Sequence, residues 1–253
     1  LNFTHIITSK TYWQYNLMAD INKELFTFGN IKNHTFKRDF FASVSWVHNQ
    51  RKIGVQIGTD CDYRVYSFEG TYNTLPFQYS VTAPKEVFDT YNKLNSLQGY
   101  FVLKYRPDYK FTASYSGRVS KAFLQHSDLL FNQQLSLRYA TNNQQSIVFS
   151  VGNYSNYGIA TYPYFSFPLY QSQQATFDFQ QQFKNGNFSI SIYYNRLTAD
   201  VNTSYQWEDT TMNTPIKQCI LGTELLADIL IAKQFKWKIA VAVFSNKEKM
   251  KDI

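Results

Sequence analysis

Six basic side chains stand where an extended chain would point them away from its apolar residues. Most of their sequence neighbours are apolar, and adjacent side chains of a strand face opposite ways. Fixed cations along a water-filled passage raise the local concentration of anions, so these residues are candidates for anion binding. The six are Lys104, Arg106, Arg118, Arg138, Lys236 and Lys238.

A second interpretation places the same cations at the rims of a membrane protein. There, Lys and Arg contact lipid phosphates instead of lining a passage. Arg118 and Arg138 lie deeper in their alternating segments than the other four, so they are the better candidates for a lumen. The sequence leaves both interpretations open.

No residue pattern of an enzyme, a metal site or a cofactor site is present. The chain has no Gly-rich phosphate loop and no GxSxG motif, and its four histidines are at no ligand spacing. Glu208 and Asp209 are adjacent, so in a strand they would face opposite sides. Cys61 and Cys219 are isolated and predict no disulfide framework. We expect a protein that is not an enzyme, with no catalytic residue, bound metal or cofactor.

The segment 174–198 illustrates the element that would position such cations. Its apolar residues occupy nearly every second position, which is typical of a strand with two unlike faces. Asn185-Gly186 is a strong signal for a two-residue hairpin turn. With that turn Phe183 would face Phe188, and a one-residue slip would destroy the agreement of the apolar face. The segment is therefore predicted to be a hairpin with one apolar and one polar face.

The same alternation recurs along the chain without a linker or a low-complexity break. Counting runs of about 8 to 12 residues predicts roughly 17–19 strands. Short turns are expected to join them, for example at Asn22-Lys23, Pro107-Asp108 and Asn142–Gln144. We expect residues 1–253 to form a single β-barrel domain, with the sequence continuing beyond both ends.

One segment departs from the alternation. In Ala83–Asn95, the apolar residues follow a spacing that fits a helix; they are Val87, Phe88, Tyr91 and Leu94. A short helix or a long loop is therefore predicted near residues 84–95.

Composition separates two architectures for such a chain, a soluble β-sandwich and a membrane barrel. Charged residues make up 17% of the sequence and aromatic residues 18%, whereas soluble domains carry roughly 25% charged residues. The polar positions hold Ser, Thr, Gln and Asn more often than the Lys and Glu that coat soluble sheets. Aromatic residues cluster near strand ends, as in the girdles of membrane barrels. We favour an all-β fold, a single closed up-and-down antiparallel membrane barrel, with a soluble sandwich of binding function as the alternative.

The net charge of +7 indicates an anionic partner. Because the basic residues are spread along the chain and form no cluster, nucleic acid is not expected. The positive charge also favours an organellar membrane over a bacterial one.

The tail LGTELLADILIAKQFKWKIAVAVFSNKEKMKDI, Leu221 to Ile253, resembles the penultimate strands of the eukaryotic porin superfamily. That superfamily holds the mitochondrial voltage-dependent anion channels and the pore subunit of the outer-membrane protein translocase. In it, a strand turns through a short basic loop into an alternating strand, and a Lys-rich turn follows. Residues 247–252 would be that turn. Glycine is scarcer here than in the anion channels, and no helix is visible before the first strand.

This resemblance implies a location in the mitochondrial outer membrane. Together with the basic residues, it predicts a porin-like channel that passes small anionic metabolites by diffusion, with membrane lipid and small anions as partners. One alternative is the protein-conducting pore of the translocase, with helical membrane subunits against its lipid face. Another is a porin-like barrel that serves as a structural subunit among other barrels of a larger assembly.

Overall fold

A computed structural model of the protein describes residues 1–28, 31–73, 85–124, 127–142, 144–158, 169–203, 212–232 and 235–249. These ranges form twelve β-strands and contain no helix. The strands are β1 (Asn2–Thr8), β2 (Thr11–Phe28), β3 (Ile31–Asn49), β4 (Ile53–Asn73), β5 (Lys85–Tyr105), β6 (Phe111–Ala122), β7 (Leu129–Asn142), β8 (Gln145–Tyr157), β9 (Leu169–Phe183), β10 (Gly186–Thr203), β11 (Met212–Ala232) and β12 (Phe235–Lys249).

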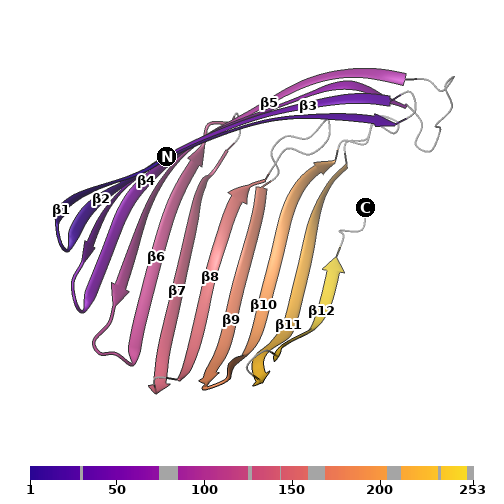
Figure 1. The fold of residues 1–253 in the computed structure, drawn as a ribbon. Coiled ribbons are helices and arrows are strands. Elements are labelled where there is room, and N and C mark those ends of the chain that lie inside the picture. Colours follow the sequence, from indigo (N-terminus) through magenta and orange to yellow (C-terminus); the bar gives the residue numbers. More distant parts are fainter. Residues whose placement is uncertain are drawn as a thin grey trace.

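The strands form one antiparallel sheet in the order of the sequence, each paired with the next (Figure 1). This confirms the predicted all-β, up-and-down architecture. Because all described strands share one sheet, the alternative of two packed sheets is wrong. The sheet is curved but open: β1 and β12 lie at its two edges and do not pair with each other within the described ranges. The predicted closure is therefore absent from this part of the chain.

Alternation along each strand gives the sheet two unlike faces. One face, which we call the apolar face, carries large hydrophobic side chains that are 41–54% exposed, for example Leu17, Ile57, Phe101, Phe177 and Trp237. The opposite, polar face borders a hollow lined by residues of the seven adjacent strands β2 to β8. Only the concave side of a curved sheet can bring seven strands around one hollow, so the polar face is concave and the apolar face convex.

The two ends of the sheet differ in the length of their connections. At one end, which we call the short-turn end, strands are separated by two to five residues, as between β3 and β4 or β9 and β10. At the opposite end, the long-loop end, the separation reaches 11 residues between β4 and β5 and between β8 and β9. Membrane barrels show the same asymmetry between periplasmic turns and extracellular loops.

An aromatic girdle lies on the apolar face near the short-turn end. Its members stand at the start of β2 and β12 or the end of β3, β5 and β7, and they are Trp13, Trp46, Tyr105, Tyr139 and Trp237. Amphipathic rings are enriched at this level of membrane barrels, where lipid tails meet head groups.

The strands are fewer and longer than predicted. Six of them run for 18 to 21 residues, for example β2 and β4, while a membrane crossing needs only about 9–11 residues. The predicted turn at Asn22-Lys23 lies inside β2, where both residues pair with β3. The polar residues Asn22 and Lys23 mark the end of the apolar face and not the end of the strand. Because such positions were read as turns, long strands were counted twice, and the predicted number of 17–19 strands was wrong.

The predicted helix or loop near residues 84–95 is also wrong from Lys85 onward. Residues 85–95 belong to β5, and each of them pairs with a residue of β4. Val87 and Tyr91 share the convex face, whereas Leu94 points to the concave face and is buried. Cross-strand pairing overrides the local spacing here. Residues 83 and 84 lie outside the described ranges, as do Glu208 and Asp209.

The hairpin of β9 and β10 keeps the predicted faces but not the predicted register. Phe183 pairs with Gly186, and Phe188 pairs with Gln181, so the turn is Lys184-Asn185. A shift of two residues leaves every side chain on its face, which is why alternation alone did not detect it. The turn at Pro107-Asp108 is confirmed, and Asn142 pairs with Gln145 where β7 returns into β8, as predicted. At the first turn, the Asp108 carboxylate accepts hydrogen bonds from the backbone N–H groups of Lys110 and Phe111.

A small hydrophobic cluster lies on the concave face toward the long-loop end. It is formed by Tyr66, Phe68, Leu94, Ala122, Leu130 and Tyr157. Among the described residues, no helix is long and apolar enough to cross a membrane.

Candidate binding surface

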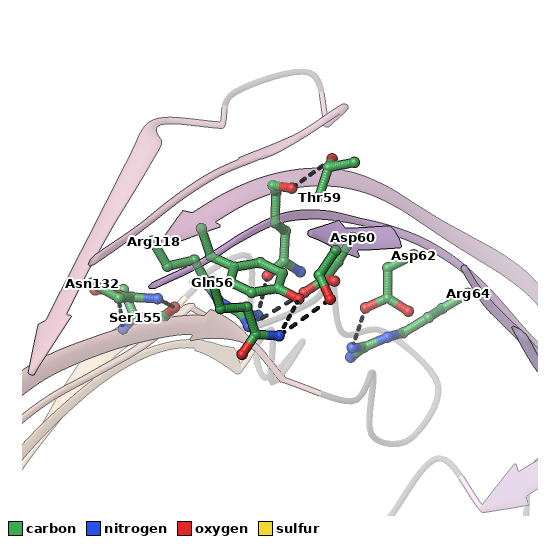
Figure 2. A network of polar contacts seen from close by, with 11 residues as sticks. Gln56, Thr59, Asp60, Asp62, Arg64, Arg118, Asn132 and Ser155 are labelled. Atoms are coloured by element: carbon green, nitrogen blue, oxygen red, sulfur yellow. Dashed lines mark hydrogen bonds and ion pairs between the residues drawn. The ribbon is translucent and has the colours of Figure 1, made fainter. Parts of the chain in front are cut away.

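An ion pair between β4 and β6 organises one part of the polar face. The side chain of Asp60 is only 5% exposed, and its Oδ2 lies 3.2 Å from Nη2 of Arg118. Nη1 of Arg118 donates a hydrogen bond of 2.7 Å to the amide oxygen of Gln98 on β5. A buried carboxylate needs such a partner, because water does not solvate it. Figure 2 shows Arg118 reaching toward Asp60 across the intervening strand.

Aromatic and amide groups complete what we call the Asp60 network. The guanidinium of Arg118 lies 5.2 Å from the ring centroid of Tyr100, within the range of a cation–π contact. Nε2 of Gln56 lies 3.4 Å from the Tyr100 hydroxyl and 3.2 Å from Oγ of Ser45. The network thus joins β3, β4, β5 and β6 on one face.

Gly58 creates the space in which the Tyr100 ring lies. A Cβ at this position would be 2.6 Å from the Tyr100 ring and hydroxyl and 2.8 Å from Cβ of Ser45. A side chain larger than hydrogen would therefore displace the ring that covers Arg118. Gly222 makes the same close approach to Tyr193 on the polar face in the other half of the sheet. Contact with an aromatic ring compensates for glycine within strands.

Further ion pairs neutralise the polar face of β2, β3 and β4. Arg64 pairs with Asp62 at 2.5 Å. Lys37 lies 2.9 Å from Asp39 and 3.7 Å from Asp20. In this half of the sheet, charged groups on the concave side contact each other directly.

A second hollow, of about 940 Å³, lies on the polar face of β7 to β12 at the short-turn end. We call it the glutamine-rich cavity. Its polar lining includes Arg138, Asn142, Gln144, Gln180, Gln182, Asn187, Asp228 and Lys238. Uncharged amides predominate, and they can donate or accept hydrogen bonds. The cavity is suited to a polar ligand or to water.

Charges around the glutamine-rich cavity include both paired and unpaired groups. Arg138 and Lys238 form no ion pair within the described ranges, whereas Lys236 lies 2.8 Å from Asp228. Asp178 and Glu224 stand in the same cross-strand row as Arg138, two and four strands away. The wall therefore carries both signs of charge, and in this row Val148 and Ser191 stand between the charged residues.

The structure divides the six predicted cations among several places. Arg118 is in the Asp60 network, and Arg138 and Lys238 share the glutamine-rich cavity. Lys236 is exposed at the start of β12, and Lys104 lies on β5, two residues after the apolar Val102 of the same face. Arg106 lies in the β5–β6 turn, where its backbone N–H donates to the carbonyl of Lys52. The six do not form one site.

Asp60, Asp62 and the base Arg64 on the polar face were missed by sequence analysis. They alternate with mostly apolar or aromatic residues in the same way as the predicted cations. That parity was available as a signal, but which acid meets which base depends on the pairing of strands. Within the described ranges, no three His, Cys, Asp or Glu side chains are grouped as metal ligands would be.

Comparison with known proteins identifies structural neighbours only. No protein-family model matches the chain, and no curated protein matches its sequence. The ferric yersiniabactin uptake receptor FyuA from Yersinia pestis superposes with a TM-score of 0.67 at 14% identity, over 96% of this chain and 41% of that chain. FpvA of P. aeruginosa, solved with a heterologous pyoverdine and iron, gives 0.73 at 10% identity, over 98% and 40%.

A third neighbour is the ferripyoverdine receptor of the outer membrane of Pseudomonas aeruginosa, with a TM-score of 0.63 at 10% identity, over 95% of this chain and 38% of that chain. The chain thus spans about two-fifths of the length of these receptors. At such low identity the likeness establishes the fold alone.

These neighbours correct the expected origin of the chain. The sheet superposes on bacterial uptake receptors, so the assignment of the tail 221–253 to the eukaryotic porins is wrong. The predicted mitochondrial outer membrane, the anion channel and the protein-translocase pore are wrong with it. Alternating strands with basic turns occur in any membrane sheet and do not distinguish these classes. Residues 247–249, predicted to be a Lys-rich turn, belong to β12.

Proposed function

We propose that this chain forms part of the barrel wall of a bacterial outer-membrane receptor that takes up a metal complex. The observation that carries the proposal is the match of 98% of the chain to FpvA at a TM-score of 0.73. The structural neighbours of the chain include receptors for ferric yersiniabactin and ferripyoverdine. An iron complex is therefore the first class of ligand to test. The role is binding and transport, not catalysis.

The dimensions of the apolar face support a membrane location. In β4 this face is apolar or weakly polar from Ile53 to Tyr63 and becomes acidic at Glu69. Eleven residues of a tilted strand correspond to about one membrane crossing. The remaining residues of β4 extend beyond that band toward the long-loop end, which in outer-membrane barrels faces the cell exterior.

The open edges support a place within a larger barrel. Strand β1 pairs only with β2 and β12 only with β11 within the described ranges. In lipid, an unpaired strand edge leaves backbone N–H and C=O groups without partners at a cost of several kcal/mol each. The proposal therefore requires further strands that pair with both edges and close the wall around the polar face.

The polar face would line the passage or contact what fills it. In the glutamine-rich cavity, Arg138 and Lys238 have no ion-pair partner within the described ranges and stand among amide groups. Cations and amide N–H groups bind the anionic oxygens of chelated metal complexes. These two cations are the residues that we assign to ligand contact.

Uptake of iron tests the proposal. Spent medium from iron-limited cultures of the source cells would be loaded with ⁵⁵Fe, and cell-associated label would be measured in wild-type cells, in cells lacking the gene, and in cells complemented with the full-length protein. We expect deletion to lower the accumulated label at least about 10-fold, with recovery on complementation. Unchanged uptake together with absence of the protein from the outer-membrane fraction would overturn the proposal.

A pair of variants would then locate ligand contact. Arg138→Gln/Lys238→Gln should reduce uptake, whereas Arg51→Gln/Lys52→Gln should not. Both pairs remove two positive charges, but Arg51 and Lys52 are exposed in the β3–β4 turn, outside the cavity. Equal effects of the two pairs would contradict the assignment of the cavity.

A further inference from the structure

Basic side chains of the convex face lie immediately beyond the apolar band. Cross-strand register places Ile21, Arg38, Val65 and Lys93 in one row across β2, β3, β4 and β5. The next row toward the long-loop end begins with Lys23 and Phe36. Lys23, Arg38 and Lys93 are all exposed.

Aromatic rings contact these three cations. The Lys23 Nζ lies 5.3 Å, and the Arg38 guanidinium 4.3 Å, from the ring centroid of Phe36. The Lys93 Nζ lies 5.1 Å from the ring centroid of Tyr63. Contacts of this kind hold a cation at the surface without neutralising it. Lys23, Phe36, Arg38, Tyr63 and Lys93 together are called the basic belt.

The charges of the basic belt remain unpaired and lie in two adjacent rows. None of its three cations forms an ion pair within the described ranges. The row below, with Ala19, Phe40, Tyr63 and Asn95, carries no charge. Directly above the belt, the register brings Glu69 opposite Asp89, so the sign of charge reverses there. A partner of the belt must therefore present negative charge at this level only.

The height of the belt matches a membrane surface. Ile53 and Val65 are twelve residues apart in β4, which corresponds to about 40 Å along the strand and, at a tilt of roughly 40°, to about 30 Å across the membrane. The apolar band of membrane barrels is about 25 Å tall. The belt thus stands where the head groups of the lipid leaflet at the long-loop end would lie.

We propose that the basic belt binds the phosphate groups of lipid A in the outer leaflet of the bacterial outer membrane. This inference rests on the proposed function, because it requires the long-loop end to face the cell exterior. Lipid A presents phosphates at the head of its acyl chains. Its chains would pack against the apolar rows below the belt while its phosphates contact Lys23, Arg38 and Lys93.

The test measures lipid A bound to the full-length protein purified in detergent from outer membranes. Co-purified lipid A would be quantified by mass spectrometry, and the delipidated protein would be titrated with lipid A and, separately, with phosphatidylglycerol. The belt variant is Lys23→Gln/Arg38→Gln/Lys93→Gln. The matched control is Lys10→Gln/Arg51→Gln/Lys52→Gln, which removes three exposed cations at the short-turn end.

We expect the belt variant to bind lipid A at least about 10-fold more weakly than the wild type, because each cation near a lipid surface contributes roughly 1 kcal/mol. The control should stay within about 2-fold. Retention of lipid A by the belt variant, equal losses in the control, or equally tight binding of phosphatidylglycerol would each overturn the inference. A folded protein found in the outer membrane without lipid A would defeat only this inference, whereas absence from the outer membrane would defeat the proposed function as well.

Discussion

The two regions of the polar face handle charge in different ways. In the Asp60 network, a nearly buried carboxylate contacts Arg118 at 3.2 Å, and a tyrosine ring covers the guanidinium. In the glutamine-rich cavity, neither Arg138 nor Lys238 forms an ion pair within the described ranges. Lys238 lies opposite Asp228 in the strand register, but the Asp228 carboxylate contacts Lys236. Charges in direct contact fix neighbouring strands to each other. Cations without such a contact can interact with water or a ligand.

This comparison first requires that the glutamine-rich cavity contain water. With Cys61 and Cys219 replaced by serine, a thiol at Gln180→Cys should react with a membrane-impermeant reagent at least about 10-fold faster than one at Phe179→Cys, because lipid contact suppresses the reactive thiolate. Phe179 lies on the convex face and Gln180 lines the cavity. Labelling rates in intact outer membranes measure the difference. Comparable rates would show that the two faces are not separated by lipid.

Removal of one cation from each region should separate structural from ligand-binding charge. Arg118→Met should lower the free energy of unfolding by about 1 to 3 kcal/mol, because it leaves Asp60 without its partner; this is less than for a fully buried pair, since Arg118 is 42% exposed. Arg138→Met should change it by no more than about 0.5 kcal/mol. Urea unfolding in detergent measures both. The comparison fails if the two variants are equally stable.

Glycine substitutions sharpen the role of the Tyr100 ring. Gly58→Ala should destabilise the protein by about 1 to 3 kcal/mol, because its Cβ would lie 2.6 Å from Tyr100. Gly99→Ala is the matched control: its Cβ would meet no atom within 4 Å, and the expected change is below about 0.5 kcal/mol. The unfolding midpoints of the two variants measure the difference. If Gly58→Ala were as stable as Gly99→Ala, the observed position of the Tyr100 ring would not contribute to stability.

The smallest effect is expected at the ion pair of Lys236 and Asp228. Their side chains are 55% and 26% exposed, and exposed pairs contribute about 0 to 1 kcal/mol. Lys236→Gln should therefore change the free energy of unfolding by less than about 0.5 kcal/mol, well below the effect at Arg118. A loss as large as that of Arg118→Met would place this pair with the Asp60 network and remove the distinction between the two regions.

Local sequence signals predicted turns well only where a side chain itself forms the turn. Asp108 caps the β5–β6 turn with its carboxylate, a device that the sequence displays directly. Asn22 and Lys23 are equally polar, yet they lie within β2, because pairing with β3 continues beyond the apolar band. Nothing in the local sequence marks whether a polar pair ends a strand or merely ends its apolar face.

For the candidate site, the sequence predicted which side chains lie on the polar face but not which of them are in contact. The alternation of polar and apolar residues predicted that Arg118 lies on the polar face. Its contact with Asp60 spans two strand pairings, β4 with β5 and β5 with β6, and each register depends on turns that the sequence defined only to within two residues. The grouping of Arg138 with Lys238, five strands apart, depended on the curvature of the whole sheet.

The sequence alone determined that this protein is a sheet with two unlike faces, because side chains of a strand alternate with a period of two whatever their partners are. It also determined where cations fall relative to the apolar face. Only the tertiary structure decided strand length, register, the open edges and which charges meet. Those properties arise from pairing between residues distant in the chain, where a shift of two residues leaves every face unchanged but gives every residue a new neighbour.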